Sequence, residues 1–156
     1  MKRFMSSQDR TCYLRRVRPE DVDLLFVWAN DPEVRKNAFH SESIPYEDHK
    51  KWFAGLLTDD SRVQYIMMDG EEAVGQIRFA LSEQSAVIDY SIAPDKRGRG
   101  YGKQLLRLAK EEVCREYPTI HTLVGQVKPA NIASAKCFVE CGYEESFRQF
   151  ELKCGE

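Results

Sequence analysis

Hydrophobic residues follow two different periods along this chain, and the two periods separate predicted strands from predicted helices. A period of two predicts strands at residues 13–18, 63–68, 73–81, 86–92 and 122–127, with a last strand or pair of strands within 143–153. Helical spacing predicts helices at 20–29, 47–57, 101–116 and 131–141, and a short helical turn at 33–36. This order predicts an α/β fold, in which a mixed sheet carries helices on its faces.

Length and composition indicate an ordinary globular domain. The chain has 156 residues, of which 42% are hydrophobic and 31% are charged. We expect a flexible N-terminus at residues 1–11 and a single domain over 12–156. The sequence has no run of the ~20 apolar residues that cross a bilayer, and its first residues are too polar for a signal sequence. These features predict a cytoplasmic protein without a membrane partner.

Charge and cysteine usage narrow the classes further. A net charge of −2 argues against a general nucleic-acid binder. The five cysteines are Cys12, Cys114, Cys137, Cys141 and Cys154. Their odd number and the lack of a Cys-x-x-Cys pair suggest reduced thiols. Cys137 and Cys141 are one helical turn apart, but no histidine lies near them, so we expect packing and no metal site.

A glycine-rich turn joins the strand at 86–92 to the helix at 101–116. Glycine and basic residues alternate there, as Arg97, Gly98, Arg99, Gly100, Gly102 and Lys103. Glycines adopt positive φ without strain, so the amides of such a turn can point into one hollow. The hollow adjoins a helix N-terminus, which favours an anion. The spacing differs from both the nucleoside-triphosphate and the dinucleotide loops, so we expect a small phosphorylated ligand.

Two signatures in the second half of the chain resemble those of the Gcn5-related N-acetyltransferase (GNAT) family. The run from Arg97 through Gly100 to Gly102 resembles the family's Arg/Gln-x-x-Gly-x-Gly/Ala. The segment from Asn131 to Tyr143 resembles its second signature. The resemblance implies a mostly antiparallel mixed sheet of about seven strands, with helices on both faces and two central strands that splay apart.

The resemblance also implies where acetyl-CoA, as co-substrate, would bind. The cofactor would lie in a cleft between the strand that ends at Ile92 and the strand that ends near Val127. The cofactor-binding residues that it implies are Ile92, Ala93, Arg97, Gly98, Arg99, Gly100, Tyr101, Gly102, Lys103, Asn131 and Ser134. The backbone of the first two would bind the pantetheine arm, and the amides of 98–103 would bind the pyrophosphate.

The N-terminal half resembles a narrower group. Trp28-Ala-Asn-Asp and His49-Lys-Lys-Trp-Phe resemble bacterial family members that acetylate amino groups of nucleotide-linked sugars, as in pseudaminic acid synthesis. The acceptor-binding residues that follow are Trp28, Asn30, Arg35, His49 and Trp52. Both tryptophans also fit the apolar faces of amphipathic helices, and His49 also fits an ordinary helix surface.

Acetyl transfer to an amine requires a base, because an alkylammonium group with a pKa of about 10.4 is mostly protonated at neutral pH. Asp89 and His49 are the candidate bases, and Glu47 and His40 are weaker choices. Asp89 stands inside an apolar strand, where an unpaired carboxylate is costly, so it either faces the cleft, which we favour, or has a partner. The alternative is an outward-facing Asp89 on the solvated side of the strand. The backbone amide of Ile92 or Ala93 would stabilise the oxyanion.

The proton donor for the departing thiolate is less clearly marked. Many GNAT members have a tyrosine seven residues after the Asn131 position, where this chain has Phe138. The proton would then come from Tyr143, from Tyr90 or from water. A thiol pKa of about 8.5 also permits departure without a dedicated acid.

These observations predict an acetyl-CoA-dependent N-acetyltransferase that works by direct transfer in a ternary complex. The acceptor is a primary amine of a small molecule, with a nucleotide-linked amino sugar as first choice. A protein N-terminus or a polyamine is the alternative acceptor. A non-catalytic acyl-CoA sensor is the alternative from a different class, because Phe138 replaces the tyrosine. A homodimer is compatible with each of these functions.

Overall fold

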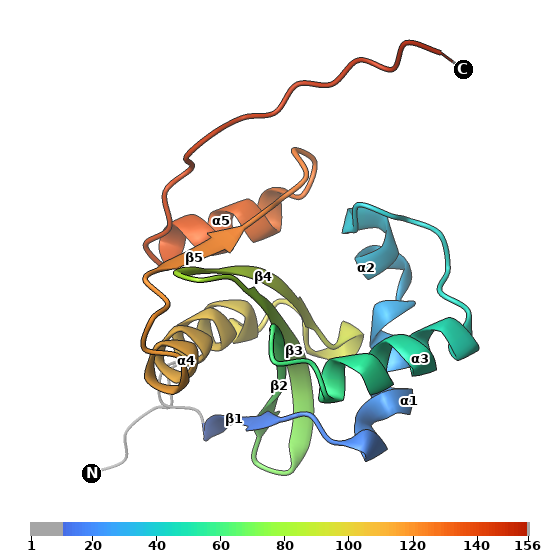
Figure 1. The fold of residues 1–156 in the computed structure, drawn as a ribbon, viewed down its shortest axis with the longest axis vertical. Helices are drawn as coiled ribbons and strands as arrows, with labels where there is room; N and C mark the ends of the chain where they lie inside the picture. Colours follow the sequence, from blue (N-terminus) through green and yellow to red (C-terminus); the bar gives the residue numbers. More distant parts are fainter. Residues whose placement is uncertain (1–10, 156) are drawn as a thin grey trace.

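The computed structural model describes residues 11–155, and within them one sheet carries helices on both faces (Figure 1). Its strands are β1 (Cys12–Arg16), β2 (Arg62–Asp69), β3 (Glu72–Leu81), β4 (Ser85–Ile92) and β5 (Thr122–Gly125). Its helices are α1 (Val22–Ala29), α2 (Pro32–Asn37), α3 (Tyr46–Leu57), α4 (Tyr101–Glu116) and α5 (Ile132–Glu140), with 3₁₀ turns η2 (Pro19–Asp21) and η3 (Pro94–Lys96). The predicted α/β class is confirmed; the expectation for residues 1–10 lies outside the described residues.

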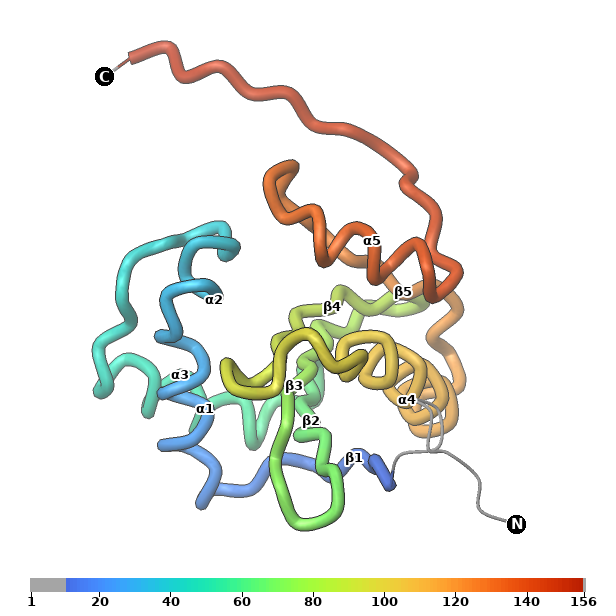
Figure 2. The backbone as a smooth tube through the Cα atoms, turned by 180° about the vertical axis from the view of Figure 1, so that it is seen from behind, coloured from blue at the N-terminus to red at the C-terminus, as the bar shows by residue number. Residues whose placement is uncertain are grey.

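The strands stand in the sheet in the order in which they occur along the chain. The first four form an antiparallel meander, because short turns join β2 to β3 and β3 to β4. The strand β5 pairs parallel to β4, because α4 carries the chain back across the sheet between them (Figure 2). The result is a mixed, mostly antiparallel sheet.

Two hydrophobic clusters hold the layers together. The helix α4 packs on one face of the sheet through its predicted apolar stripe, in which Leu105, Leu106, Ala109 and Val113 are buried. The helices α1 and α3 pack on the other face through Leu25, Trp28, Phe53 and Leu56. Because the two clusters lie on opposite faces, the sheet is the middle layer between the helices.

The structure has fewer strands than the roughly seven that we expected, since five occur within residues 11–155. The missing strands fall in the predicted last segment, 143–153, which has no regular structure. A strand requires a neighbouring strand for its backbone groups. The segment leaves the body of the protein and pairs with none of the five strands (Figure 1).

The strands β4 and β5 diverge part-way along β4. Their pairing runs from Ser85–Thr122 to Ile88–Gly125, and β4 continues to Ile92 without β5. This divergence is the splay that we expected.

The ring of Phe138, from α5, lies where the two strands part. A Cβ atom built on Gly125 would stand only 2.3 Å from Cζ of Phe138, so the ring occupies the space of a side chain at this position. The same ring makes an edge contact with Tyr90 of β4, with 5.5 Å between ring centroids. Glycine at 125 therefore allows α5 to approach the end of β5.

This contact predicts the effect of filling the space. Gly125→Ala should lower the free energy of unfolding by about 1–3 kcal/mol, because the new methyl group overlaps a buried ring. In Phe138→Ala, which itself costs about 3–5 kcal/mol, the second substitution Gly125→Ala should cost much less, because the ring has gone. Urea denaturation of the two single variants and the double variant measures the coupling.

The matched control is Gly155→Ala, which has no atom within 4 Å of the added Cβ and should leave the stability unchanged. Additive effects of Gly125→Ala and Phe138→Ala would contradict the contact.

Candidate functional site

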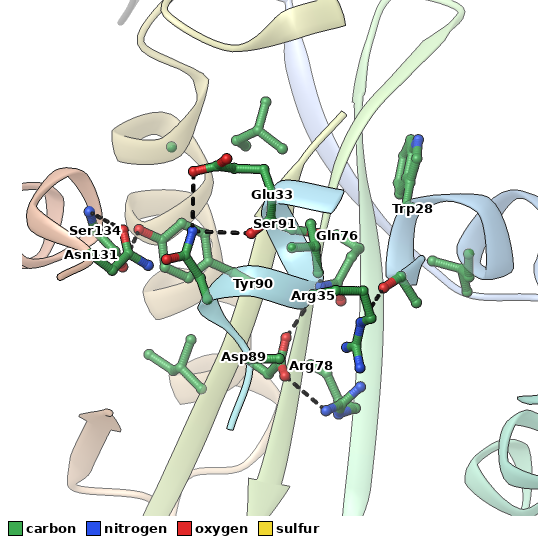
Figure 3. A pocket seen from close by; sticks show the side chains of 18 of the residues that line it. Trp28, Glu33, Arg35, Gln76, Arg78, Asp89, Tyr90, Ser91, Asn131 and Ser134 are labelled. Atoms are coloured by element: carbon green, nitrogen blue, oxygen red, sulfur yellow. Dashed lines mark hydrogen bonds and ion pairs between the residues drawn. The ribbon is translucent and has the colours of Figure 1, made fainter. Parts of the chain in front are cut away.

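A cavity of about 910 Å³ opens where β4 and β5 part. Its walls come from α1, α2 and α3 on one side, from the turn before α4 and from α5 on the other, and from β4 between them. Figure 3 shows Asp89 directed toward Arg78 and Tyr90 directed toward Ser134, so consecutive residues of β4 serve different parts of the cavity.

The glycine turn forms one end of the cavity. Gly98 and Gly100 have φ of +76° and +83°, as the predicted curl of the backbone requires. Gly102 does not have positive φ, which corrects our expectation for it. It lies in the first turn of α4, where an added Cβ would be 3.3 Å from Sγ of Cys137, and so it allows close packing of α4 and α5.

The three basic residues of the turn differ in their surroundings. Arg97 forms an ion pair of 2.5 Å with Asp31, and Lys103 forms one with Glu140 of α5. Arg99 is exposed. The first amides of α4 have no acceptor within the helix, as at any helix N-terminus, so the turn combines several N–H donors with positive charge.

The backbone of β4 distinguishes the two predicted pantetheine contacts. The amide of Ala93 donates to the carbonyl of Val74 at 2.8 Å, so it is already paired with β3. Backbone groups of an antiparallel strand alternate between its two edges. Tyr90 and Ile92 therefore direct their amide and carbonyl groups toward the edge that β5 has left, beyond the last paired position at Ile88.

A row of polar side chains lines the cavity on the face of the sheet beneath α1 and α3. Asp89 accepts an ion-pair hydrogen bond of 2.9 Å from Arg78 and a 3.4 Å contact from Nε2 of Gln76. Gln64 donates to Gln76 at 2.9 Å, and the buried Oε1 of Gln64 has no partner among the described residues. The prediction for Asp89 was that it faces the cleft, and in the structure it also has a cationic partner.

Trp52, from α3, packs against Arg78 of this row of polar side chains. The guanidinium of Arg78 lies 4.7 Å from the centroid of the Trp52 ring, a cation–π distance. Trp52, Arg78 and Asp89 thus form a stack and an ion pair on one wall of the cavity.

His49 touches the cavity but is held as part of the core. Its side chain is 3% exposed and lies among Phe26, Trp52 and Phe53. Its Nε2 is 3.0 Å from the carbonyl oxygen of Val22, and because a carbonyl only accepts, Nε2 carries the hydrogen. Burial lowers the pKa of His49 below its ordinary value of 6.5.

The other predicted acceptor residues have mixed positions. Trp28 and Arg35 line the cavity, whereas Asn30 does not. Asn30 exchanges two hydrogen bonds, of 2.8 and 2.9 Å, with the backbone of Ile44. Arg35 donates to the carbonyls of Ala29 and His40 at 2.7 and 2.8 Å. Both side chains thus hold the loop that connects α2 to α3.

The two tyrosines that were candidate proton donors, Tyr90 and Tyr143, line different cavities. Tyr90 lines the cavity, and its hydroxyl shares a 3.0 Å hydrogen bond with Oγ of Ser134. Tyr143 lies on Phe138 at 4.9 Å between ring centroids and lines a second, smaller cavity of about 310 Å³ instead. Burial raises the pKa of Tyr143 to about 12, and its hydroxyl has no partner among residues 11–155.

Comparison with known proteins identifies the family. A model of the GNAT acetyltransferase domain matches residues 12–144. The chain belongs to the GNAT acetyltransferase family. The predicted family and enzyme class are thereby confirmed.

This GNAT chain is similar to several acetyltransferases. It is 22% identical over 120 residues to the acetyltransferase PseH of Campylobacter jejuni, covering 76% of this chain and 74% of that protein. Its fold is similar to that of spermidine N-acetyltransferase from Vibrio cholerae in complex with CoA and spermine, with a TM-score of 0.78, 17% identity, and 87% and 83% of the two chains covered. It is also similar to aminoglycoside acetyltransferase AAC(6')-Ib in complex with coenzyme A, with a TM-score of 0.75, 19% identity, and 86% and 85% covered.

The cavity brings together most of the predicted GNAT site. Of the cofactor set, the lining includes Ile92, Arg97, Gly98, Gly100, Tyr101, Gly102, Asn131 and Ser134, but not Ala93, Arg99 or Lys103. Sequence reasoning missed Gln64, Gln76 and Arg78. Their signal was available, because each is a polar residue inside an otherwise apolar strand. The pairing of the strands, which places these three residues beside Asp89, could not be read from the sequence.

The burial of His49 predicts a specific pH dependence. A histidine whose pKa is lowered by folding takes up a proton more readily when unfolded, so stability should fall as the pH drops below 6.5. His49→Gln keeps a donor for Val22 but cannot titrate. Its free energy of unfolding, measured by urea denaturation between pH 5 and about 7.5, should depend less on pH than that of the native protein.

His121→Gln is the control, because His121 is exposed, and it should follow the native pH dependence. If His49 were the general base, folded His49→Gln would lose roughly 10²–10⁴-fold in kcat. We expect a loss well below that range.

Proposed function

We propose that the protein is an acetyl-CoA-dependent N-acetyltransferase that transfers acetyl directly to a primary amine within a ternary complex. The observation that carries this proposal is the open edge of β4, where Tyr90 and Ile92 direct backbone groups into a cavity that ends at the glycine turn. In a GNAT domain this arrangement fits an extended pantetheine arm followed by a pyrophosphate.

The residues present fit acetyl-CoA at both ends. Gly98 and Gly100 have positive φ, so the backbone curls just before the start of α4, where a diphosphate would accept hydrogen bonds from its amides. The β4 edge offers alternating donors and acceptors, as the amides of a pantetheine arm require. We assign the pantetheine to Tyr90 and Ile92 in place of the predicted pair Ile92 and Ala93. Bound acetyl-CoA supplies the activated acetyl group.

We assign the acceptor to the wall that holds Trp52, Arg78 and Asp89. The side chain of Tyr90 lies on the opposite face of the sheet from this wall. The acceptor and the cofactor would therefore meet at the edge of β4. A nucleotide-linked amino sugar suits it, because an aromatic ring beside a guanidinium binds a base or a phosphate. The resemblance of residues 28–31 and 49–53 to family members that acetylate nucleotide-linked sugars supports the same acceptor class.

A polyamine is less well matched to this cavity. The lining contains four lysine or arginine residues and three acidic ones, namely Arg35, Arg78, Lys96, Arg97, Glu33, Asp48 and Asp89. A polycation would favour a strongly acidic groove.

Side chains and backbone of this chain supply a proposed general base, an oxyanion donor and a general acid for the transfer. Asp89 lies on the acceptor wall and, as the proposed general base, accepts a proton from the amine. The backbone amide of Tyr90, on the open edge, is placed to stabilise negative charge on the carbonyl oxygen. The hydroxyl of Tyr90 is the proposed acid, because partial burial raises the pKa of Tyr90, which keeps it protonated at neutral pH, and because it lines the cavity beside Phe138.

The test of the function follows free thiol while the protein turns over acetyl-CoA with a panel of amines. We expect thiol release with a nucleoside-diphosphate-linked amino sugar, and a much higher KM for the same sugar without its nucleotide. Preference for spermidine or for a peptide N-terminus would replace the acceptor assignment. Binding of acetyl-CoA without thiol release on any amine would favour the sensor.

Gly100→Glu should abolish CoA binding in calorimetry, because a carboxylate would enter the anion hollow. Gly70→Glu is the matched control, since Gly70 also has positive φ (+63°) but lies at the turn between β2 and β3. It should share any backbone strain and keep the native affinity. Native affinity in folded Gly100→Glu would remove the turn from the cofactor site.

The proposed proton roles predict two slow variants. Asp89→Asn and Tyr90→Phe should each lower kcat by roughly 10²–10⁴-fold with little change in the Kd for CoA, because each removes a proton-transfer group and leaves the backbone in place. Tyr143→Phe removes a hydroxyl outside the cavity and should keep the native kcat. A native rate in Tyr90→Phe together with a slow Tyr143→Phe would reverse the assignment of the acid.

A further inference from the structure

The helix α2 lines the cavity without being anchored in the core. Glu33, Val34 and Arg35 all line the cavity, and Figure 3 shows the first and the last of them together with side chains of β4. None of the residues Pro32–Asn37, all of which the structure describes, is buried. A short helix without buried apolar contacts keeps its place through polar contacts, so these contacts decide how well this wall of the cavity is ordered.

Asp31 connects the start of α2 to the glycine turn. Its carboxylate accepts a hydrogen bond from the amide of Val34 at 3.2 Å, so it caps the N-terminus of the helix. The same carboxylate pairs with the guanidinium of Arg97 at 2.5 Å. Arg97 belongs to the turn before α4, which lines the same cavity. One side chain therefore joins α2 to the turn that we assign to the pyrophosphate.

This ion pair is better sheltered than an ordinary surface pair. The side chain of Asp31 is 13% exposed, and that of Arg97 is 37% exposed. Fully exposed pairs contribute little, because water and salt screen them. A carboxylate that is mostly withdrawn from water depends more strongly on its partners. We therefore expect the loss of Arg97 as a partner to loosen α2.

The other end of α2 meets a second segment of the proposed cofactor side. The ammonium group of Lys128, in the loop between β5 and α5, donates to the carbonyl of Lys36 at 3.3 Å. A cation is favoured at the C-terminal end of a helix. Gln126 and Asn131, on either side of Lys128 in sequence, line the cavity. Both ends of α2 are thus held by basic side chains from segments that line the cavity.

We propose that Asp31 is a positioning residue for acceptor binding: paired with Arg97, it fixes α2 relative to the glycine turn and so orders the acceptor side of the cavity. Asp31 is not among the described residues that line the cavity, so it acts through α2 and not by touching a substrate. The inference rests on the proposed function, which assigns the turn to the cofactor and the facing walls to the amine.

Asp31→Asn separates the two contacts of this side chain. Asparagine caps a helix about as well as aspartate but has no charge, so the cap is kept and the ion pair is lost. At saturating acetyl-CoA the KM for the amine should rise by roughly 5–10-fold, while kcat and the Kd for CoA stay within about 2-fold of the native values. The amine is UDP-glucosamine, or spermidine if the sugar is not turned over.

The matched control is Glu112→Gln, which removes an ion pair with Arg115 inside α4 and should keep the native KM. A native KM in folded Asp31→Asn would overturn the proposal.

Arg97→Gln tests whether the effect passes through the ion pair. At saturating acetyl-CoA it should raise the KM for the amine by a factor similar to that of Asp31→Asn. In the double variant the two increases should not multiply, because both substitutions remove the same contact. Effects that multiply would mean that Asp31 acts independently of Arg97, and would overturn the proposal.

Amide hydrogen exchange on α2 gives a readout that needs no acceptor. In Asp31→Asn the amides of residues 35–38 should exchange faster than in the native protein, while those of α3 are unchanged. Unchanged exchange in α2 would overturn the proposal. If neither amine releases thiol, the proposed function fails, and the exchange of α2 still decides whether the ion pair holds this helix.

Discussion

The site depends on the end of the pairing between β4 and β5. Up to Ile88 the two strands share hydrogen bonds, and from there to Ile92 the backbone of β4 faces a cavity. Phe138 lies against Gly125 at the point of divergence, where no larger residue than glycine fits on β5. Buried backbone groups need partners, so a strand edge opened in this way favours a ligand with amides of its own.

The strand β4 then divides the chemistry between its edge and its two faces. Its backbone at Tyr90 and Ile92 is directed to the open edge, the side chain of Tyr90 to α5, and that of Asp89 to the wall beneath α3. Successive side chains of a strand alternate between faces, so one short segment serves both proposed substrates. The glycine turn follows directly, and therefore the end of the cavity that we propose for the pyrophosphate is positioned by the same strand.

Local patterns predicted most of the fold and the glycine turn that lines one end of the cavity. The apolar stripe of α4 and the alternation in β2, β3 and β4 are local signals, and the structure reproduces their positions closely. The final strand was not reproduced, because alternation at 143–153 reports a capacity to pair and not the presence of a partner. His49 and Ala93 show a second limit: the chain alone does not reveal that Val22 and Val74 already accept their N–H groups.

We propose that the open β4 edge binds the cofactor through alternate residues. Amide hydrogen exchange, resolved by residue, with and without saturating acetyl-CoA tests this assignment. We predict that the amides of Tyr90 and Ile92 exchange quickly in the free protein and slow strongly on binding, while Ala93, paired with Val74, is protected in both states. Unchanged exchange at Tyr90 and Ile92 in the acetyl-CoA complex would mean that this edge does not bind the cofactor.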